Sequence, residues 1–368
     1  MFCIMLVFGT RPEAIKMCPL LRELKSREGF RVVTAVSGQH REMLDDVLRA
    51  FDVKPDYDLN LMREGQGQAG LAAAVLEGVS RILEREKPDL LLVHGDTTTA
   101  FAAAEAGFYA RIPVGHVEAG LRTYDMQSPF PEEFNRQAIG LMASYHFAPT
   151  ERAADHLRRE GKGADSIFVT GNTGIDALKY TVRRDYSSPL SEWGKTGRLV
   201  LLTLHRRENQ GRRMEEMLGA IRLVARERES LRILFPVHPN PAVRHVVEAA
   251  LGDDPHVRLC EPLGVVDFHN LMAQSEMILT DSGGIQEEAT ALGFPTLVLR
   301  DCTERPEGIA AGALCLAGTS FSEVYRHFSA LCDSAFLRRR MKKADNPFGD
   351  GCASARIADL IAAVAGKK

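Results

Sequence analysis

The chain of 368 residues lacks long hydrophobic runs. No stretch approaches the roughly 18 uninterrupted apolar residues that a transmembrane helix requires. Residues 2–8 are apolar, but this run is too short for a signal peptide and lacks the expected flanks. We therefore expect a protein that does not use a membrane as partner.

Cysteine pairs are also missing. The seven cysteines form no CxxC pair and no Cys/His cluster with zinc spacing, so no metal is expected. Their odd number and scatter fit reduced thiols in a cytoplasmic protein. The net charge of −3 gives no reason to expect nucleic acid as partner. Any affinity for phosphate must therefore be local.

Two sequences that resemble nucleotide-binding motifs lack the context these motifs need. Gly65–Gly70 matches GxGxxG, but it does not follow the first strand of a βαβ unit, and Asp89, about 20 residues later, begins a strand. Gly194–Thr196 matches the end of a phosphate-binding P-loop, but Pro189 replaces its leading glycine. We therefore expect no nicotinamide cofactor and no P-loop ATPase.

What the chain does contain is an alternation of strands and helices. A length of 368 residues predicts two domains. Buried parallel strands are expected where apolar residues run without interruption. These runs lie at residues 2–8, 31–36, 89–94, 114–117 and 166–170, and again at 198–203, 231–237, 257–260, 277–280 and 296–299. With helices between them, they predict two doubly wound α/β sheets, joined by a weakly periodic connection at 180–197.

The stretch Thr280–Ala289 carries the clearest ligand signal. A strand that ends in Asp-Ser-Gly-Gly and leads into a helix leaves free N–H groups at the helix start, where Ser282, Gly283 and Gly284 lie. Such groups favour a phosphate, and Glu288 is placed to accept hydrogen bonds from a ribose. The alternative is an ordinary serine-capped helix with a Gly-Gly turn and solvated glutamates.

Acidic and basic residues follow several strands of the first half. Arg11 and Lys16 follow the first strand, whereas Asp96 and Glu118 follow two neighbouring strands, and Glu132 begins a helix. Because ligands of open α/β sheets bind at the carboxyl ends of the strands, these side chains are expected to converge. Clustered carboxylates suit general acid and base catalysis. Helix capping by Asp96 and stabilisation of the helix dipole by Glu132 are the alternatives.

Four residues of the second half also come from strand ends or neighbouring segments. They are candidates for binding, although each is a weak signal alone: His205, His238, Phe268 and Arg305.

Taken together, these motifs resemble the non-hydrolysing UDP-N-acetylglucosamine 2-epimerase family over essentially the whole chain. The matching runs, in order, are Gly9–Lys16, His94–Thr99, His116–Thr123, Pro129–Arg136, Gly171–Leu178, His205–Asn209, Pro236–Pro241, Thr280–Ala289 and Thr303–Glu307. The resemblance implies two Rossmann-like domains in the GT-B arrangement, with a UDP-sugar in the interdomain cleft, and a homodimer. The first domain would comprise residues 1–170 and a final helix at about 353–368, and the second 171–352.

The resemblance also assigns roles. It implies that the catalytic residues are Asp96, Glu118, Glu132 and His205. It implies that the nucleotide sugar is bound by Arg11, Lys16, Arg136, His238, Phe268, Ser282, Gly283, Gly284, Glu288 and Arg305. A second UDP-N-acetylglucosamine can act as an activator in bacterial members, and Gln39, His40 and Glu42 match one version of that region. Gly65 stands where some members have arginine, so activation stays open.

The chemistry implied is reversible epimerisation at C2, which would feed the synthesis of cell-surface polysaccharide precursors. The C2 proton is not next to a carbonyl, so direct removal at neutral pH is not feasible. Departure of UDP from C1 acidifies it and gives a 2-acetamidoglucal, to which UDP returns after protonation on the opposite face. Alternatives on the same motifs are a hydrolysing 2-epimerase that releases N-acetylmannosamine and UDP, a 2-epimerase of a related nucleotide sugar, and a GT-B glycosyltransferase.

Overall fold

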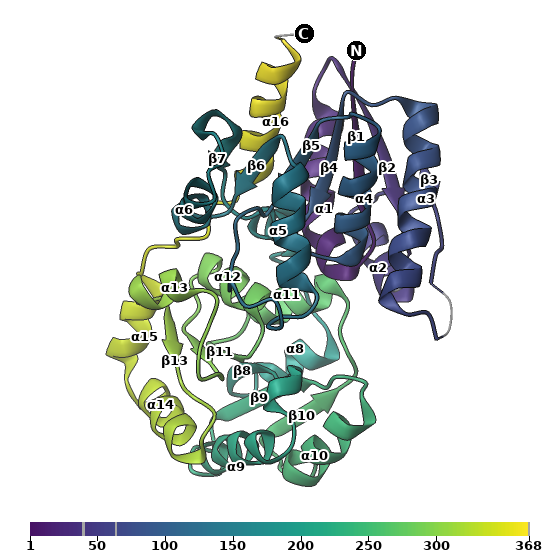
Figure 1. Ribbon diagram of the computed structural model, residues 1–368. Coiled ribbons are helices and arrows are strands. Elements are labelled where there is room, and N and C mark those ends of the chain that lie inside the picture. The colour runs from purple at the N-terminus through teal and green to yellow at the C-terminus, as the bar shows by residue number, and fades with distance from the viewer. Residues whose placement is uncertain (39–40, 63–64, 367–368) are drawn as a thin grey trace. The chain divides into compact units, whose positions relative to one another are not determined.

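The computed structural model describes residues 1–38, 41–62 and 65–366. The contacts within the chain divide it into two compact units (Figure 1). Unit 1 comprises Met1–Tyr180 and Phe348–Lys368, and unit 2 comprises Thr181–Pro347. Each unit contains one parallel sheet with its own helices.

The sheet of unit 1 has seven parallel strands in the order β3-β2-β1-β4-β5-β6-β7. Its central strands are buried because their side chains are apolar on both faces, as in the run Phe2–Phe8. The strands are β1 (Phe2–Phe8), β2 (Phe30–Val36), β3 (Tyr57–Asp58), β4 (Leu90–His94), β5 (Val114–Val117), β6 (Tyr145–Ala148) and β7 (Ile167–Val169).

The helices of unit 1 begin at well-defined caps. Thr10 and Glu13 form a capping box at the start of α1, and the Thr97 side chain caps α4. Helix α3 packs on α4, α4 on α5, and α16 on α1. The helices are α1 (Arg11–Ser26), α2 (Arg41–Ala50), α3 (Gln68–Glu86), α4 (Thr98–Tyr109), α5 (Glu132–Met142), α6 (Glu151–Arg159), α7 (Thr173–Thr181) and α16 (Ala353–Ala365), with a 3-10 turn η1 at Ala164–Ser166.

The sheet of unit 2 has six parallel strands in the order β10-β9-β8-β11-β12-β13. The strands are β8 (Arg198–Thr203), β9 (Leu231–Pro236), β10 (Val257–Cys260), β11 (Met277–Thr280), β12 (Thr296–Val298) and β13 (Leu314–Leu316). Its helices are α8 (Pro189–Gly194), α9 (Arg212–Arg226), α10 (Pro241–Leu251), α11 (Val265–Ala273), α12 (Gly283–Ala291), α13 (Pro306–Ala310), α14 (Phe321–Asp333) and α15 (Ala335–Lys342), with a 3-10 turn η2 at Arg207–Asn209. Unit 2 is therefore a second Rossmann-like domain.

Both sheets reverse their strand order at one point. In unit 1 this switch point lies between β1 and β4, and in unit 2 it lies between β8 and β11. Doubly wound sheets bind ligands outside the carboxyl ends of the strands at the switch point. The segments that follow these four strands are therefore the places to look for a site.

The boundaries between the units differ from those expected from the sequence. Residues 171–180 and 348–352, which were expected in the second domain, belong to unit 1. The Asn172 amide donates to the Phe348 carbonyl over 2.9 Å, and the Asp176 carboxylate accepts hydrogen bonds from the first amides of α16. These long-range bonds tie both segments to unit 1. The expected connection at 180–197 also contains a short helix, α8.

Candidate active site

In unit 1, Glu13 joins the segments after β1 and β4. One of its carboxylate oxygens accepts from the amides of Gly9 (3.0 Å) and Thr10 (2.8 Å), and the other accepts from the Thr97 hydroxyl (2.7 Å). The side chain is buried, and this burial raises the pKa of Glu13 despite the hydrogen bonds. Glu13 therefore fixes the two turns at the switch point relative to each other.

Asp96 lies two residues after the end of β4 and contacts Arg136 from α5. The Arg136 guanidinium donates to an Asp96 carboxylate oxygen and, over 3.3 Å, to Glu133. Burial raises the pKa of Asp96, and the nearby Glu118 charge adds to this, whereas Arg136 acts in the opposite direction. Asp96 is thus a carboxylate whose surroundings favour holding a proton.

Glu118 directly follows β5 and faces a different environment. Lys16 from α1 donates to its Oε2 atom, and the Asn172 side-chain amide donates to the same oxygen over 3.0 Å. Donors of this kind favour the ionised carboxylate. The backbone of Glu118 has a φ of 62°, a left-handed conformation that non-glycine residues rarely adopt. Such strain is common at functional sites.

Three histidines are buried in the neighbouring strands β4, β5 and β6. His94 ends β4, its Nε2 atom is 3.7 Å from Glu118 Oε2, and neither ring nitrogen has a hydrogen-bond partner among the described residues. His116 and His146 are register partners in β5 and β6. Burial lowers the pKa of His94 and of His146 to about 4, and that of His116 to about 3. All three imidazoles are therefore neutral at physiological pH.

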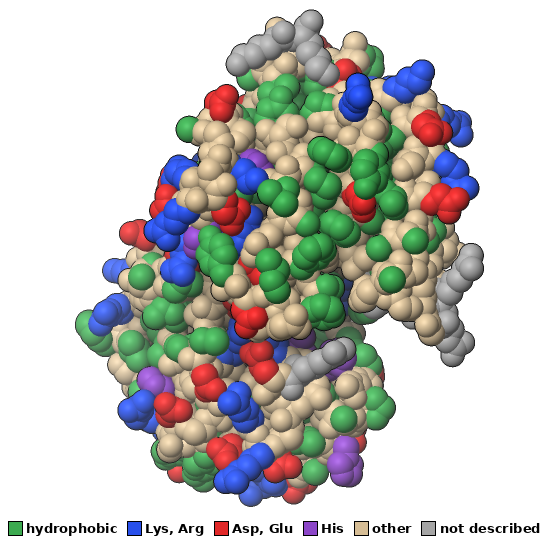
Figure 2. Space-filling view, viewed as in Figure 1, with side chains coloured by type: hydrophobic (Ala, Val, Ile, Leu, Met, Phe, Trp, Pro, Cys, Tyr) green, Lys and Arg blue, Asp and Glu red, His purple; other side chains and the backbone are tan. Residues whose placement is uncertain are grey.

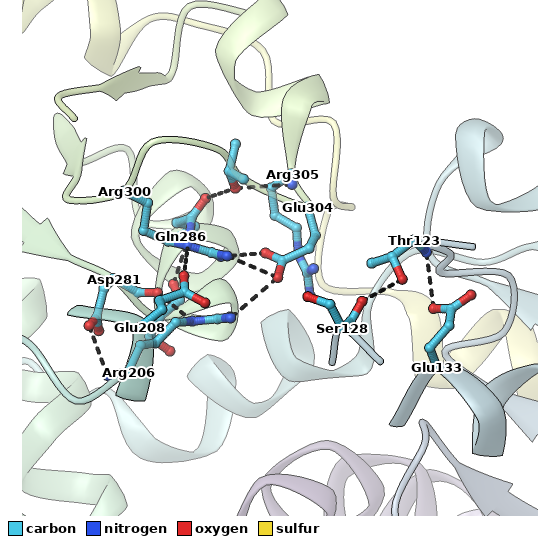
Figure 3. Close-up of polar contacts among 12 residues, drawn as sticks. Thr123, Ser128, Glu133, Arg206, Glu208, Asp281, Gln286, Arg300, Glu304 and Arg305 are labelled. Carbon is cyan, nitrogen blue, oxygen red and sulfur yellow. Dashed lines mark hydrogen bonds and ion pairs between the residues drawn. The ribbon is translucent and has the colours of Figure 1, made fainter. Parts of the chain in front are cut away.

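The two glutamates at the start of α5 have different surroundings. Glu133 is buried and accepts from the Thr123 amide (Figure 3) and from the Tyr124 amide, each over 3.0 Å. Burial alone would raise its pKa, but these bonds, Gln137 and Arg136 hold it below its usual range. Glu132 is half-buried in the first turn. Glu133 is the residue that positions the 123–124 loop.

In unit 2, Asp281 directly follows β11 and organises the switch point. Its carboxylate accepts from the amides of His205 (3.0 Å) and Arg206 (2.9 Å), and from the Asn209 side chain (3.0 Å). The His205 ring Nδ1 lies 2.9 Å from the same carboxylate, while the ring is 44% exposed. Burial alone would raise the pKa of Asp281, but the bonds from His205 and Arg206 lower it. The Asp281 carboxylate thus holds the His205 ring in an orientation that leaves part of it exposed to solvent.

Helix α12 presents an open N-terminus. Ser282 occupies the N-cap, but its side chain makes no capping hydrogen bond. A Cβ atom on Gly283 would lie 3.4 Å from the Arg305 guanidinium carbon, whereas one on Gly284 would meet nothing within 4 Å. The Arg305 side chain also donates to Glu287 over 2.5 Å. First-turn amides and an adjacent guanidinium together suit a phosphate group.

An ion-pair network lies beside this turn (Figure 3). Glu304 accepts from Arg300 over 2.5 Å and pairs with Arg206 at 3.3 Å, and Arg300 also pairs with Glu208 at 3.0 Å. Burial alone would raise the pKa of Glu304, but these arginines lower it to about 2. The Arg206 side chain donates to the Asp281 carbonyl over 2.9 Å. The network therefore connects the turns after β8 and β11 to the loop after β12.

The remaining predicted binding residues of unit 2 lie on three different elements. The Glu288 carboxylate is 3.5 Å from the buried His269 ring, whose other nitrogen bonds Thr181. Phe268 is half-buried in α11. His238 is exposed, and its ring is stacked with that of His205 at a centroid distance of 6.5 Å. Partial burial and His205 lower the pKa of His238.

Some predicted residues therefore gather, and others do not. Unit 1 brings together Lys16, Asp96, Glu118 and Arg136, and unit 2 brings together His205, His238, Ser282, Gly283 and Arg305. Arg11 is half-buried at the first position of α1. Gln39 and His40 lie outside the described residues, and the side chain of Glu42 is also not described. In the described ranges, no group of three or more His, Cys, Asp or Glu side chains could hold a metal ion.

Sequence reasoning did not select three residues that build the site. Glu13 and Asp281 were visible as carboxylates next to strand ends, a signal that could have identified them. Asn172 lies two residues after the predicted strand 166–170, but nothing in the sequence pairs it with Glu118, which is far away in the chain.

Two Rossmann-like domains, one with clustered carboxylates and one with a helix start that suits a phosphate, fit the class of proteins that act on nucleotide sugars. A family model described as UDP-N-acetylglucosamine 2-epimerase matches residues 22–362. The chain belongs to this family.

Comparisons with individual proteins lead to the same family. The chain is 53% identical to the UDP-N-acetylglucosamine 2-epimerase of Bacillus subtilis, over 97% of this chain and 94% of that protein. Its fold matches a co-structure of S. aureus MnaA with UDP (TM-score 0.94, 47% identity, 100% of this chain and 97% of the other). It also matches the Neisseria meningitidis enzyme bound to UDP-GlcNAc (TM-score 0.92, 41% identity, 98% and 100%). These matches confirm the GT-B fold class predicted from the sequence. Among the described helices, none is long and apolar enough to cross a bilayer.

Proposed function

We propose that this chain interconverts UDP-N-acetylglucosamine and UDP-N-acetylmannosamine by inversion at C2. The main support is that Asp96 and Glu118 lie at the same edge of the sheet but in different environments. Burial raises the pKa of Asp96, whereas Lys16 and Asn172 donate hydrogen bonds to Glu118. Two carboxyl groups whose environments favour different protonation states suit an acid and a base.

In the proposed reaction, the C1–O bond to UDP breaks, and the electron pair leaves with the diphosphate. Glu118 then accepts the C2 proton, which leaves a C1–C2 double bond in a 2-acetamidoglucal. Protonation of C2 on the opposite face, with Asp96 or Glu132 as donor, and return of the UDP oxygen to C1 complete the inversion. The product has the same atoms as the substrate, so no water is consumed.

The set in unit 2 would hold UDP throughout this cycle. The open start of α12, Arg305 and His205 would stabilise the charge of the departing diphosphate, and Glu288 would accept from the ribose hydroxyls. Arg305 is bonded to Glu287, so that ion pair must share the guanidinium with a bound phosphate.

The test is incubation with a panel of nucleotide sugars in deuterium oxide. UDP-N-acetylglucosamine should gain deuterium at C2 and yield a mixture of C2 epimers that retain the coupling of the anomeric proton to phosphorus. Loss of that coupling would instead identify the hydrolysing alternative. If only another nucleotide sugar gained deuterium at C2, that sugar would be the substrate of the proposed reaction. Absence of exchange with every sugar would refute epimerisation.

We further propose a homodimer that forms through the outer face of α4 and α5. Three large side chains there are strongly exposed: Leu141 (79%), Tyr109 (67%) and Phe108 (57%). Figure 2 shows hydrophobic side chains on this region of unit 1. Adjacent exposed apolar groups are typical of interfaces. Sedimentation should give a dimer for the wild type and a monomer for Leu141→Glu, and a wild-type monomer would refute this proposal.

Seven free thiols support a reducing, cytoplasmic location.

A further inference from the structure

Asn172 lies immediately before α7 and is almost completely buried. Two hydrogen bonds of its side chain carry the argument: Oδ1 accepts from the Gly174 amide over 2.8 Å, and Nδ2 donates to Glu118 Oε2 over 3.0 Å. A backbone amide can only donate, so the first bond determines which end of the side-chain amide faces Glu118. The group that reaches the carboxylate is therefore the donor.

The backbone of Asn172 is held by a part of the chain that is distant in sequence. Its amide donates to the Phe348 carbonyl over 2.9 Å. Gly171 and Gly349 touch, since a Cβ atom on Gly171 would lie only 3.3 Å from the Gly349 Cα atom. Their φ angles of 89° and 127° are also values that side chains disfavour. Two glycines thus allow a close backbone contact that sets the position of Asn172.

Glu118 needs such support. Its own backbone is left-handed, and it follows a short strand. Among the described residues, charged and titratable groups face its carboxylate from three elements: Lys16 from α1, His94 from β4 and Asp96 from the loop after β4. Lys16 stabilises the anion, Asp96 repels it when ionised, and His94 is neutral. Asn172 is the uncharged donor of this set.

We propose that Asn172 is a positioning residue for Glu118: it directs the carboxylate and favours its ionised form. This inference rests on the proposed function, in which Glu118 accepts the C2 proton. It assigns to the turn before α7 a part in the reaction, although Asn172 itself touches no reacting atom in this scheme. The simpler reading is that Asn172 only caps α7.

Asn172→Asp separates the two readings. Aspartate is as good an N-cap as asparagine and has nearly the same shape, so a capping residue would tolerate this change. It would, however, replace the donor by a second carboxylate next to Glu118. We expect kcat to fall about 100-fold, the scale of general acid–base catalysis. The acidic limb of the kcat/KM profile should move to higher pH, while the affinity for UDP stays unchanged. Because two buried carboxylates then repel each other, the melting temperature should fall at neutral pH and recover as the pH is lowered.

Two further variants serve as comparison. Asn172→Ser keeps a capping oxygen but removes the donor without adding charge, so its loss of kcat should be smaller than that of Asn172→Asp. Ser188→Asp introduces aspartate at the N-cap of α8, where the Ser188 hydroxyl accepts from the Ser191 amide over 3.1 Å. It should leave kcat unchanged and thereby control for the added charge.

A readout without turnover keeps this proposal distinct from the proposed function. Carbon-13 NMR of the side-chain carboxyl groups, with the Glu118 signal assigned by Glu118→Gln, should show Glu118 titrating at higher pH in Asn172→Asp. If the wild type is inactive but the Glu118 signal still titrates at higher pH in Asn172→Asp, only the epimerase proposal is refuted. An active Asn172→Asp variant with an unchanged pH profile and unchanged titration would overturn the role of Asn172.

Discussion

The switch points of the two sheets share one topology but differ in how they treat charge. In unit 1, carboxylates and neutral histidines are crowded into the edge, and the pKa of Asp96 is raised. In unit 2, hydrogen bonds from amides stabilise the ionised Asp281 carboxylate, and arginines stabilise the ionised Glu304 carboxylate. The pKa values of both are lowered. The first arrangement suits proton transfer, because a proton can be held or released there. The second suits anion binding, because its own acids stay ionised and paired.

The largest expected effect tests the chemical side of this contrast. Asp96→Asn should lower formation of the C2 epimer by at least about 100-fold, because an amide cannot deliver the proton to the opposite face, although UDP still binds. Glu118 can still remove and return the C2 proton in this variant, so deuterium should enter C2 with retention of configuration. The measurement is the ratio of C2 epimers by NMR alongside UDP titration by calorimetry. Epimer formation at the wild-type rate would remove Asp96 from the proposed mechanism.

The next test concerns the binding side. Asp281→Asn should weaken UDP binding by about 100-fold, since it replaces an anion that accepts from two amides and one side chain with a group that offers one oxygen. The exposed Asp253, which pairs with Arg222, provides a control. If Asp281→Asn and Asp253→Asn bound UDP equally well, the organising role of Asp281 would be wrong.

The third test uses pH. A buried His146 with a pKa of about 4 stays neutral when folded, whereas the unfolded chain binds a proton below its ordinary pKa of 6.5. This residue's contribution is therefore present above pH 6.5 and is lost as the pH falls toward 4. His146→Gln should reduce the acid-induced loss of stability of unit 1 between pH 7 and 5 by about 2 kcal/mol.

Hydrogen exchange of unit 1 peptides measures this difference, with His245→Gln as control on an exposed side chain of unit 2. Glu13, Asp96 and Asp176 have raised pKa values and act in the opposite direction, so the comparison of variants is more informative than the wild-type profile alone. Equal pH dependence in His146→Gln and the wild type would contradict the assignment.

The smallest effect is expected at Glu288. Glu288→Ala should weaken UDP binding about 10-fold, because it removes an acceptor for ribose hydroxyls next to His269. Free UDP and the glucal should also accumulate during turnover, and ion-exchange chromatography would detect both. Unchanged affinity without leakage would mean that Glu288 is only a buried structural acid.

Much of the fold could be predicted because buried parallel strands are nearly continuous apolar runs. The runs at residues 2–8 and 277–280 correspond to β1 and β11. Helix α3 was not predicted, although its buried residues Leu71, Val75, Val79 and Ile82 recur at helical spacing. Its N-cap is Gly67, which has no side chain to form a capping hydrogen bond, so the start of this helix carries no clear sequence signal.

The site was less predictable because strand ends reveal position but not partners. Arg136 was expected to bind substrate, and the structure bonds it to Asp96 and Glu133. The identity of the neighbour decides whether a carboxylate holds a proton or a charge. That neighbour can come from more than a hundred residues away, as Lys16 does for Glu118.

The return of the chain to unit 1 affects the order in which the protein can fold during synthesis. Residues 181–347 form a continuous unit and leave the ribosome before the segment that begins at Phe348. Unit 1 starts first but remains without α16 and without the carbonyl that holds Asn172 until that segment emerges. The N-terminal half therefore matures last, which reverses the usual vectorial order of domain folding.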